Sequence, residues 1–348
     1  MRRLSIILLW LLLAVPLTAK NKALLIGVSD YPEGSGWCKL NAHNDVTLLR
    51  EALGPGWDVT VLEDKNATHK GIVNAFKKVT RTIAVGDTVL VHFSGHGQQM
   101  LPIEEDPLHD PDMLDEAIIP FDAKKSWTPD YTGQNHIRDN EFGALIDGIR
   151  NKAGTDGLVV VVLDACHSDS MERGDDDSSI SDGKVFRGAY DIFGQSVPDD
   201  LYRHRFKNDT SSIQINSNAH VVYISACQAH SRNQEIMTPS GERYGSLSYA
   251  VACSLDDNGL SCMPSFLDGI KSVMGNIVPG QRPIIRASFL YDKETISAPL
   301  YDDKEPIRAP TTTTVTLKTP KHNVVILILV TLIIICSAVL FVWKMKKY

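Results

Sequence analysis

The chain lacks the features that mark several large classes of protein. Its 348 residues carry a formal net charge of −7 at pH 7, so no basic field attracts nucleic acid, which is dropped as a partner. No glycine-rich phosphate loop follows the first predicted strand (residues 22–28), where the sequence reads GVSDYPEGSGW, and this disfavours a nucleotide-binding domain. The six cysteines include no CxxC spacing, so a zinc site is not indicated.

Both ends of the chain carry long apolar runs. Residues 1–19 combine two early arginines, an apolar core and a small residue at Ala19, which is typical of a cleaved signal peptide; an uncleaved anchor is the alternative. Val324 to Trp343 is uncharged and long enough to cross a bilayer, and the basic residues in 344–348 mark a cytoplasmic tail. The sequence therefore predicts a single-pass membrane protein whose main domain lies on the extracytoplasmic side.

The body between these ends is long enough for one large domain with a substantial core. Residues 301–323 are rich in Thr, Pro and charge, and they predict a linker rather than a packed element. Cys253 and Cys262 are close enough in sequence to form a disulfide, with buried free thiols as the alternative.

Apolar β-rich runs alternate with helical patterns along this body. Strands are predicted at residues 22–28, 57–64, 87–95, 157–165, 220–227 and 282–288, and helices at 44–53, 68–83, 138–152, 242–255 and 264–277. The alternation favours an α/β fold, with a parallel sheet covered by helices on both faces. A long insert, Arg173 to Ser212, interrupts the pattern and is too polar to predict a core.

Two strands of this pattern end in reactive side chains. The run TVLVHFSGHGQQM delivers His96, and VVVVLDACHSDS delivers Cys166. A thiol attacks as a thiolate, and a nearby imidazole can take its proton and return one to a leaving amine. Gly95 and Gly97 leave room for a substrate backbone and for main-chain N–H groups that face an oxyanion. The pair predicts a cysteine nucleophile with a histidine base.

These motifs, in this order, resemble those of the caspase-like cysteine peptidases of the C14 family, and within them the type I metacaspases. The resemblance rests on FSGHG (93–97), DEAIIPFD (115–122) and LDACHS (163–168), and it covers about residues 21–290. It implies a three-layer αβα sandwich around a mostly parallel six-stranded sheet, at residues 20–300. A large part at about 20–172 and a small part at about 213–300 flank the insert. By resemblance, His96 is the general base, Cys166 is the nucleophile and Gly97 contributes to the oxyanion site.

The resemblance also implies a specificity pocket for Arg or Lys, built from Asp45, Ser94 and Asp164. Ser94 lies two residues before His96, and Asp164 two before Cys166, so each projects to the same face of its strand as its catalytic neighbour. Carboxylates at these positions would pair a guanidinium, ideally through two hydrogen bonds.

Many relatives of this kind are activated by calcium. The matching residues here are Asp115, Asp139 and Asn140, while a fourth position holds Arg173, which opposes a cation. No cofactor is required by the Cys/His chemistry, and calcium stays an open alternative.

The preferred function is a membrane-anchored cysteine endopeptidase that cuts protein or peptide substrates after Arg or Lys. The insert carries basic residues that match this preference, so self-processing there is a further hypothesis; they are Lys184, Arg187, Arg203, Arg205 and Lys207. The alternative is a catalytically silent caspase-like binding module displayed on the membrane. The presence of both His96 and Cys166 argues against it, since a binding module has no chemical need for either.

Overall fold

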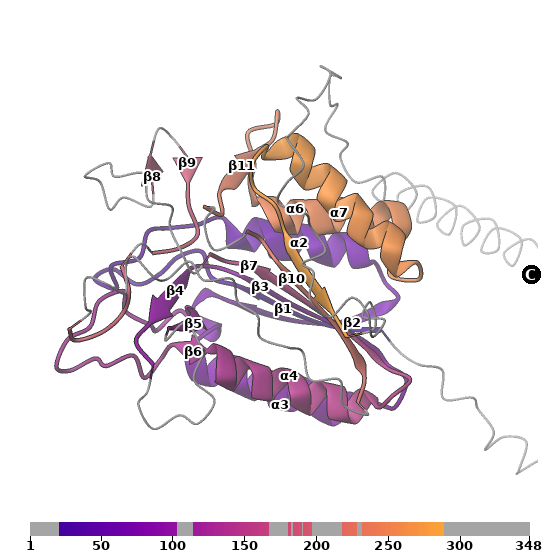
Figure 1. The fold of residues 1–348 in the computed structure, drawn as a ribbon, viewed down its shortest axis with the longest axis horizontal. Coiled ribbons are helices and arrows are strands. Elements are labelled where there is room, and N and C mark those ends of the chain that lie inside the picture. Colours follow the sequence, from indigo (N-terminus) through magenta and orange to yellow (C-terminus); the bar gives the residue numbers. More distant parts are fainter. Residues whose placement is uncertain are drawn as a thin grey trace, which may run out of the picture.

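A computed structural model describes most of the predicted body of the chain. The described residues are 21–102, 114–166, 180–181, 184–189, 191–196, 218–227 and 232–288. Figure 1 shows a central sheet with helices above and below it.

The central sheet has six strands in the order β13-β10-β7-β3-β1-β2. Their bounds are β1 (Asn21–Gly27), β2 (Trp57–Glu63), β3 (Thr88–Ser94), β7 (Leu158–Asp164), β10 (His220–Ser225) and β13 (Ile284–Ala287). All neighbours pair in parallel except β10 and β13, which are antiparallel. The predicted mostly parallel six-stranded sheet is confirmed, and its parallel strands present their carboxyl ends at one edge.

Helices cover both faces of the sheet. They are α2 (Ala42–Leu53), α3 (His69–Thr82), α4 (Asp139–Ala153), α6 (Ser246–Asn258) and α7 (Met263–Ile277), with a short 3-10 turn, η1 (Asp64–Asn66). Figure 1 shows α3 and α4 on one side and α2, α6 and α7 on the other. The α3 helix begins after Thr68, whose side chain accepts a hydrogen bond from the Gly71 N–H, as the sequence predicts for a Thr cap.

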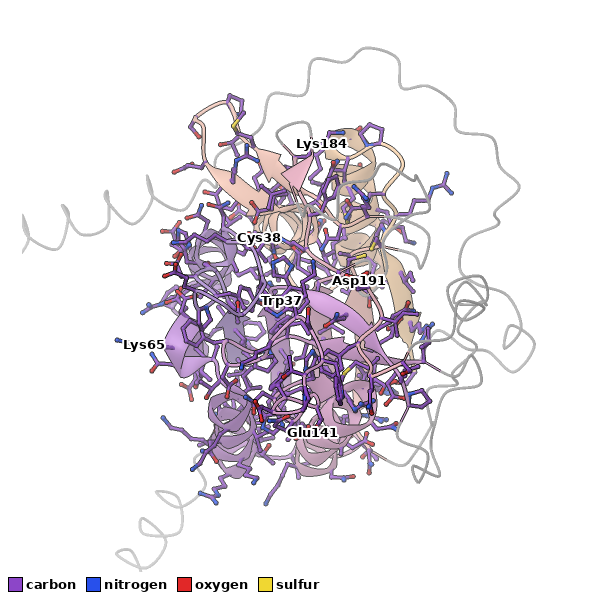
Figure 2. All side chains as sticks on the ribbon, turned by 90° about the vertical axis from the view of Figure 1, so that its left-hand side faces the viewer. Trp37, Cys38, Lys65, Glu141, Lys184 and Asp191 are labelled. Carbon is purple, nitrogen blue, oxygen red and sulfur yellow. The ribbon has the colours of Figure 1, made fainter. Side chains whose placement is uncertain are left out.

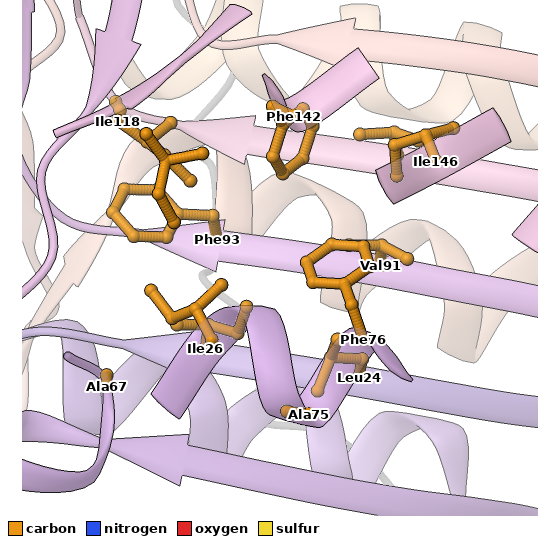
Figure 3. Packing of buried hydrophobic residues seen from close by; sticks show 14 of the residues in the cluster. Leu24, Ile26, Ala67, Ala75, Phe76, Val91, Phe93, Ile118, Phe142 and Ile146 are labelled. Carbon is orange, nitrogen blue, oxygen red and sulfur yellow. The ribbon is translucent and has the colours of Figure 1, made fainter. Parts of the chain in front are cut away.

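The alternation of side chains along the strands builds two cores. In β1, Leu24 and Ile26 face the α3/α4 side, whereas Ala23 and Leu25 face the α2/α6/α7 side. Figure 3 shows Leu24 beside Phe76 of α3 in the first core, to which Ile26 also belongs. Full burial of one such side chain contributes about 1.5–3 kcal/mol relative to exposure. The two apolar faces hold the sheet rigid between its helix layers.

Several smaller elements were not predicted from the sequence. A three-stranded sheet contains β4 (Gly97–Met100), β5 (Asp115–Ile118) and β6 (Ile137–Arg138), and two hairpins pair β8 (Ile180–Ser181) with β9 (Lys184–Val185) and β11 (Glu235–Met237) with β12 (Arg243–Gly245). The helix expected from residue 242 begins at Ser246, because residues 243–245 pair with β11.

The insert is not wholly polar surface, contrary to the sequence prediction. Arg187, Ala189, Ile192 and Phe193 are all buried. The Phe193 N–H donates to the Gln99 carbonyl, and the Leu101 N–H donates to the Phe193 carbonyl, so this part of the insert is hydrogen-bonded along β4. The middle of the insert therefore belongs to the folded body.

The predicted single-pass membrane localisation needs correction. None of the helices in the described part of the chain is long and apolar enough to span a bilayer. The longest, α4 and α7, have 15 residues each, whereas a span needs roughly 20. The runs at 1–19 and at Val324 to Trp343, together with the 301–323 linker, lie outside the described residues.

The five cysteines in the described ranges are all free thiols, so the Cys253–Cys262 disulfide is absent from this part of the chain. The alternative of buried free thiols is right about the free thiols but not about burial, since Cys253 is only partly buried and Cys262 is exposed.

Candidate active site

The predicted catalytic residues lie at the same end of two adjacent strands. Strands β3 and β7 pair in parallel with Ser94 opposite Asp164, and His96 and Cys166 each follow two residues later. The Gly95 N–H donates to the Asp164 carbonyl at 3.3 Å, which extends this pairing one residue beyond β3. Figure 2 looks toward this edge of the sheet, with Trp37 and Cys38 labelled near its centre.

The His96 ring is held by neighbours that favour one neutral tautomer. Its Nε2 lies 3.1 Å from the Cys38 carbonyl oxygen, and since a carbonyl can only accept, Nε2 carries the proton. The ring stacks on Trp37, with 4.8 Å between ring centroids. Burial lowers the pKa of His96 to about 3, so the ring is neutral near pH 7. Its Nδ1 is buried without a hydrogen-bond partner among the described residues, and is free to accept a proton.

The backbone next to His96 is also fixed. The Tyr31 hydroxyl accepts a hydrogen bond from the His96 N–H and donates to the Ile119 carbonyl, both at 3.0 Å. Burial raises the pKa of the Tyr31 hydroxyl above its usual value, so the group stays neutral and keeps both roles. These contacts leave little freedom in the position of the proposed base.

The Cys166 sulfur is buried and accepts a hydrogen bond from a second thiol. Cys227, just past the end of β10, donates to it across 3.2 Å. This hydrogen bond, together with burial, raises the pKa of Cys227 well above its usual value. Cys227 therefore remains a donor, and a donated S–H, although weak, favours negative charge on Cys166. No motif or spacing in the sequence singled out Cys227.

A segment of the insert crosses the site, with bends at Arg187 and Gly188. The Cys166 N–H donates to the Arg187 carbonyl at 2.7 Å, the Arg187 N–H donates to the Asn233 carbonyl at 2.9 Å, and the Ala189 N–H donates to the Gly97 carbonyl at 3.1 Å. The group facing the Arg187 carbonyl oxygen is thus the main-chain N–H of Cys166. Gly97 takes part through its carbonyl, and an oxyanion role for its N–H stays a prediction.

The Arg187 side chain lies among the residues predicted for basic specificity. Its Nη2 is 2.8 Å from Asp45 Oδ2 and 2.9 Å from Glu235 Oε1. Its Nη1 is 2.5 Å from Ser94 Oγ and 3.7 Å from Asp164 Oδ2. The guanidinium is fully buried. We call the group formed by Asp45, Ser94, Asp164 and Glu235 the arginine site; sequence reasoning found the first three and missed Glu235.

Each acid of the arginine site is oriented by further hydrogen bonds. Asp164 accepts from the Asn233 side chain at 2.7 Å and from the N–H and hydroxyl of Ser248 at 2.7 and 2.6 Å. Asp45 accepts from the Ser94 hydroxyl and from the Gly245 N–H. These donors orient the two carboxylates toward the site.

Glu235 is fixed from the opposite side of the guanidinium. Its carboxylate accepts from the backbone N–H of Asn41 at 2.7 Å and from the Asn41 side chain at 2.6 Å. The sequence did not predict Glu235 as a site residue, because it begins a short hairpin strand rather than following a strand of the main sheet.

Burial and charge set opposite protonation tendencies for two of the acids. Burial raises the pKa of Asp45 to about 7, although the Arg187 charge opposes the shift. For Asp164, burial also raises the pKa, but Arg187 and the hydrogen bonds from Ser248 and Asn233 outweigh it, and the pKa lies below its usual value. Burial lowers the pKa of Arg187, but the three surrounding acids together outweigh burial and raise it above its usual value, so the guanidinium stays charged. Asp164 is therefore the firmer anion of the two.

The arginine site has no spare room at Gly245. A Cβ there would lie 2.2 Å from Asp164 Oδ2 and 2.5 Å from Arg187 Nη1. Only glycine lets the main chain approach the carboxylate and the guanidinium this closely.

The predicted calcium ligands do not assemble in the same way. The Asp115 carboxylate is hydrogen-bonded to the guanidinium of Arg138, which already supplies a cation. Asp139 accepts from the Asn140 N–H at the start of α4. Within the described ranges, no three His, Cys, Asp or Glu side chains are grouped closely enough to hold a metal ion. This arrangement does not fit a calcium ion at Asp115, and calcium activation stays a prediction.

An αβα sandwich in which His96 and Cys166 follow two adjacent parallel strands defines the caspase-like class of α/β domains. A family model described as "Caspase domain", of the C14 peptidases, matches residues 20–293, and the chain belongs to this family.

Curated relatives in the comparison are metacaspases. The chain is 27% identical over 168 residues to metacaspase III c of Phaeodactylum tricornutum, covering 44% of either chain. It is 29% identical over 160 residues to metacaspase-7 of Arabidopsis thaliana, covering 43% of this chain and 35% of that one. The matched region spans less than half the length of these relatives. A crystal structure of a protein from Geobacter sulfurreducens has a TM-score of 0.51 and 24% identity, covering 77% of this chain and 93% of that one, and supports the fold alone.

Proposed function

We propose that the protein is a cysteine endopeptidase that cleaves after arginine or lysine, with Cys166 as nucleophile and His96 as base. One observation carries the proposal: a buried arginine, Arg187, occupies the acidic site while its carbonyl oxygen accepts the Cys166 N–H. A basic side chain and the carbonyl that follows it are thus both held beside the nucleophile, as an arginine substrate would be.

The arrangement supports the following chemistry. The Cys166 proton passes to His96 Nδ1, the thiolate adds to the substrate carbonyl carbon, and the oxyanion accepts the Cys166 N–H. Protonated His96 then donates to the amine that leaves, which releases the C-terminal product and leaves a thioester. Water adds to the thioester with His96 as base, releasing the carboxylate product and restoring the thiol. The Cys38 carbonyl stabilises the imidazolium that forms, because Nε2 keeps its donated hydrogen bond.

Self-processing follows from the same placement, and we assign it to the bond between Arg187 and Gly188. Arg187 is one of the five basic residues of the insert named above, and it lies between the predicted large and small parts. Of these five, Lys184 and Arg187 lie in the described residues; Lys184 is exposed, whereas Arg187 is fully buried. Cleavage here would release the segment that covers Cys166 and His96. Arg187→Gln should remain uncut where Lys184→Gln is processed normally; cutting of both variants at the wild-type rate would contradict the assignment.

The function itself is tested with the full chain on fluorogenic peptides carrying Arg, Lys, Asp or Asn before the scissile bond, with and without calcium. Wild type should cleave the Arg and Lys peptides, and Cys166→Ala none of them. Cleavage only after Asp or Asn would refute the specificity assignment. Absence of all cleavage, together with failure of a basic chloromethylketone to label Cys166, would favour the silent binding module instead.

A further inference from the structure

We infer that the enzyme prefers an Arg–Gly bond, and that Glu235 is the residue that favours arginine over lysine. The inference deepens the proposed function and rests on it. Two separate observations carry it, one on each side of the bond between Arg187 and Gly188.

On the arginine side, the site engages both terminal nitrogens of a guanidinium. Nη2 lies between Asp45 and Glu235, at 2.8 and 2.9 Å, and Nη1 bonds Ser94 on the other side. A lysine side chain ends in one compact ammonium group, which cannot occupy both nitrogen positions at once. The fork geometry of the guanidinium therefore matches this site, and the ammonium does not.

Glu235 supplies the acceptor at the far end of this fork. Its carboxylate bonds Nη2 and is held by the two Asn41 donors, and it is only 5% exposed. Hydrogen bonds between ionised partners are about twice as strong as neutral ones. Loss of the Glu235 charge should therefore weaken arginine binding more than lysine binding, because a single ammonium group contacts fewer of these acceptors at once.

On the other side of the bond, the space admits only glycine. A Cβ at Gly188 would lie 2.3 Å from the Cys166 carbonyl oxygen and 3.1 Å from Cys166 Cβ. The first of these is a main-chain atom of the nucleophile itself, so it cannot turn aside as a flexible side chain would. The Arg187 carbonyl is meanwhile fixed by the Cys166 N–H. A side chain after the arginine would shift the carbonyl from this position.

The test compares four otherwise identical quenched peptides, with Arg–Gly, Arg–Ala, Lys–Gly and Lys–Ala at the scissile bond. They are assayed with the full chain as wild type, Glu235→Gln and the control Glu242→Gln, which changes an exposed acid in the turn of the same hairpin. Ratios of kcat/KM within one preparation are used, since they do not depend on how much of a variant is folded.

Wild type should cleave Arg–Gly about tenfold or more faster than either Lys–Gly or Arg–Ala. Glu235→Gln should lower the Arg/Lys ratio by about tenfold while the Gly/Ala ratio stays unchanged, and Glu242→Gln should change neither. An Arg/Lys ratio that Glu235→Gln leaves unchanged would overturn the role of Glu235, and equal rates for Gly and Ala would overturn the glycine preference. In both cases the proposed function stands, whereas cleavage of none of the four peptides by wild type would overturn it as well.

Discussion

At two places in this protein an arginine side chain contacts acidic residues, and the two places differ in how the arginine is held. In the arginine site, Arg187 comes from the insert, is fully buried and contacts acids from three separate parts of the chain. At Asp115, the partner Arg138 comes from the neighbouring strand β6, is 19% exposed at its side chain and forms one ion pair. The first arrangement resembles a bound ligand, and the second is a structural pair within one small sheet.

The difference shows that the number of acids in a segment does not predict a cation site. The arginine site forms because parallel strands deliver Ser94 and Asp164 to one edge, where α2 adds Asp45. Asp115 begins β5 of the small sheet and Asp139 begins α4, the helix that follows that sheet, but Asp115 is engaged by Arg138. The arginine site is built from separate elements that meet at one edge of the sheet, and this distinguishes it from the pair of Asp115 and Arg138.

The largest expected contrast is in catalysis. Asp164→Asn removes the firmer anion of the arginine site and should lower kcat/KM for arginine peptides by about 100-fold or more, whereas Asp115→Asn should change it by less than about threefold. Steady-state kinetics of the two variants, with thermal unfolding to confirm that both fold, measures the contrast. Equal losses in the two variants would show that the two groups of acids are not distinct in function.

The next contrast is in stability, measured by urea unfolding in the Cys166→Ala background so that the chain stays uncut. Arg187→Gln leaves several buried carboxylates without their cation and should lower the free energy of unfolding by about 3–5 kcal/mol. Arg138→Gln should cost less, because its pair is partly hydrated. The contrast would be broken if Arg138→Gln were the more destabilising of the two.

A third prediction concerns pH. Because the folded protein raises the pKa of Asp45 from 3.8 to about 7, it retains a proton there that the unfolded chain loses. The stabilising contribution is fully present below pH 3.8 and is lost as pH rises through 7. The free energy of unfolding of Cys166→Ala, relative to the same protein with Asp45→Asn, should therefore fall between pH 4 and pH 8. Parallel curves for the two proteins would contradict it; Asp268→Asn, at an exposed position, serves as the control.

The smallest expected effect is that of calcium. Since Arg138 already engages Asp115, added calcium should change the rate on arginine peptides by less than about twofold. A strong activation that Asp115→Asn abolishes would show that calcium displaces Arg138 from Asp115. Asp115 would then belong to a cation site rather than to a structural ion pair.

The sequence predicted the six strands, the helix layers and the shared edge that carries His96 and Cys166, because hydrophobic periodicity and parallel pairing are enough to place strand ends. It also placed Asp45, Ser94 and Asp164 together through a resemblance. It did not identify Glu235 or Cys227 as site residues, since both depend on how segments distant in sequence pack. Above all, it treated Arg187 as one of five equivalent basic residues, and only the folded insert distinguishes it.

The most direct test of the account is to determine the new chain ends of the full-length wild-type protein by mass spectrometry once it has become active on arginine peptides, with Cys166→Ala treated in parallel. The account predicts one cut, with a new C-terminus at Arg187 and a new N-terminus at Gly188, and an intact Cys166→Ala chain. Full activity with the bond between Arg187 and Gly188 still intact would contradict it.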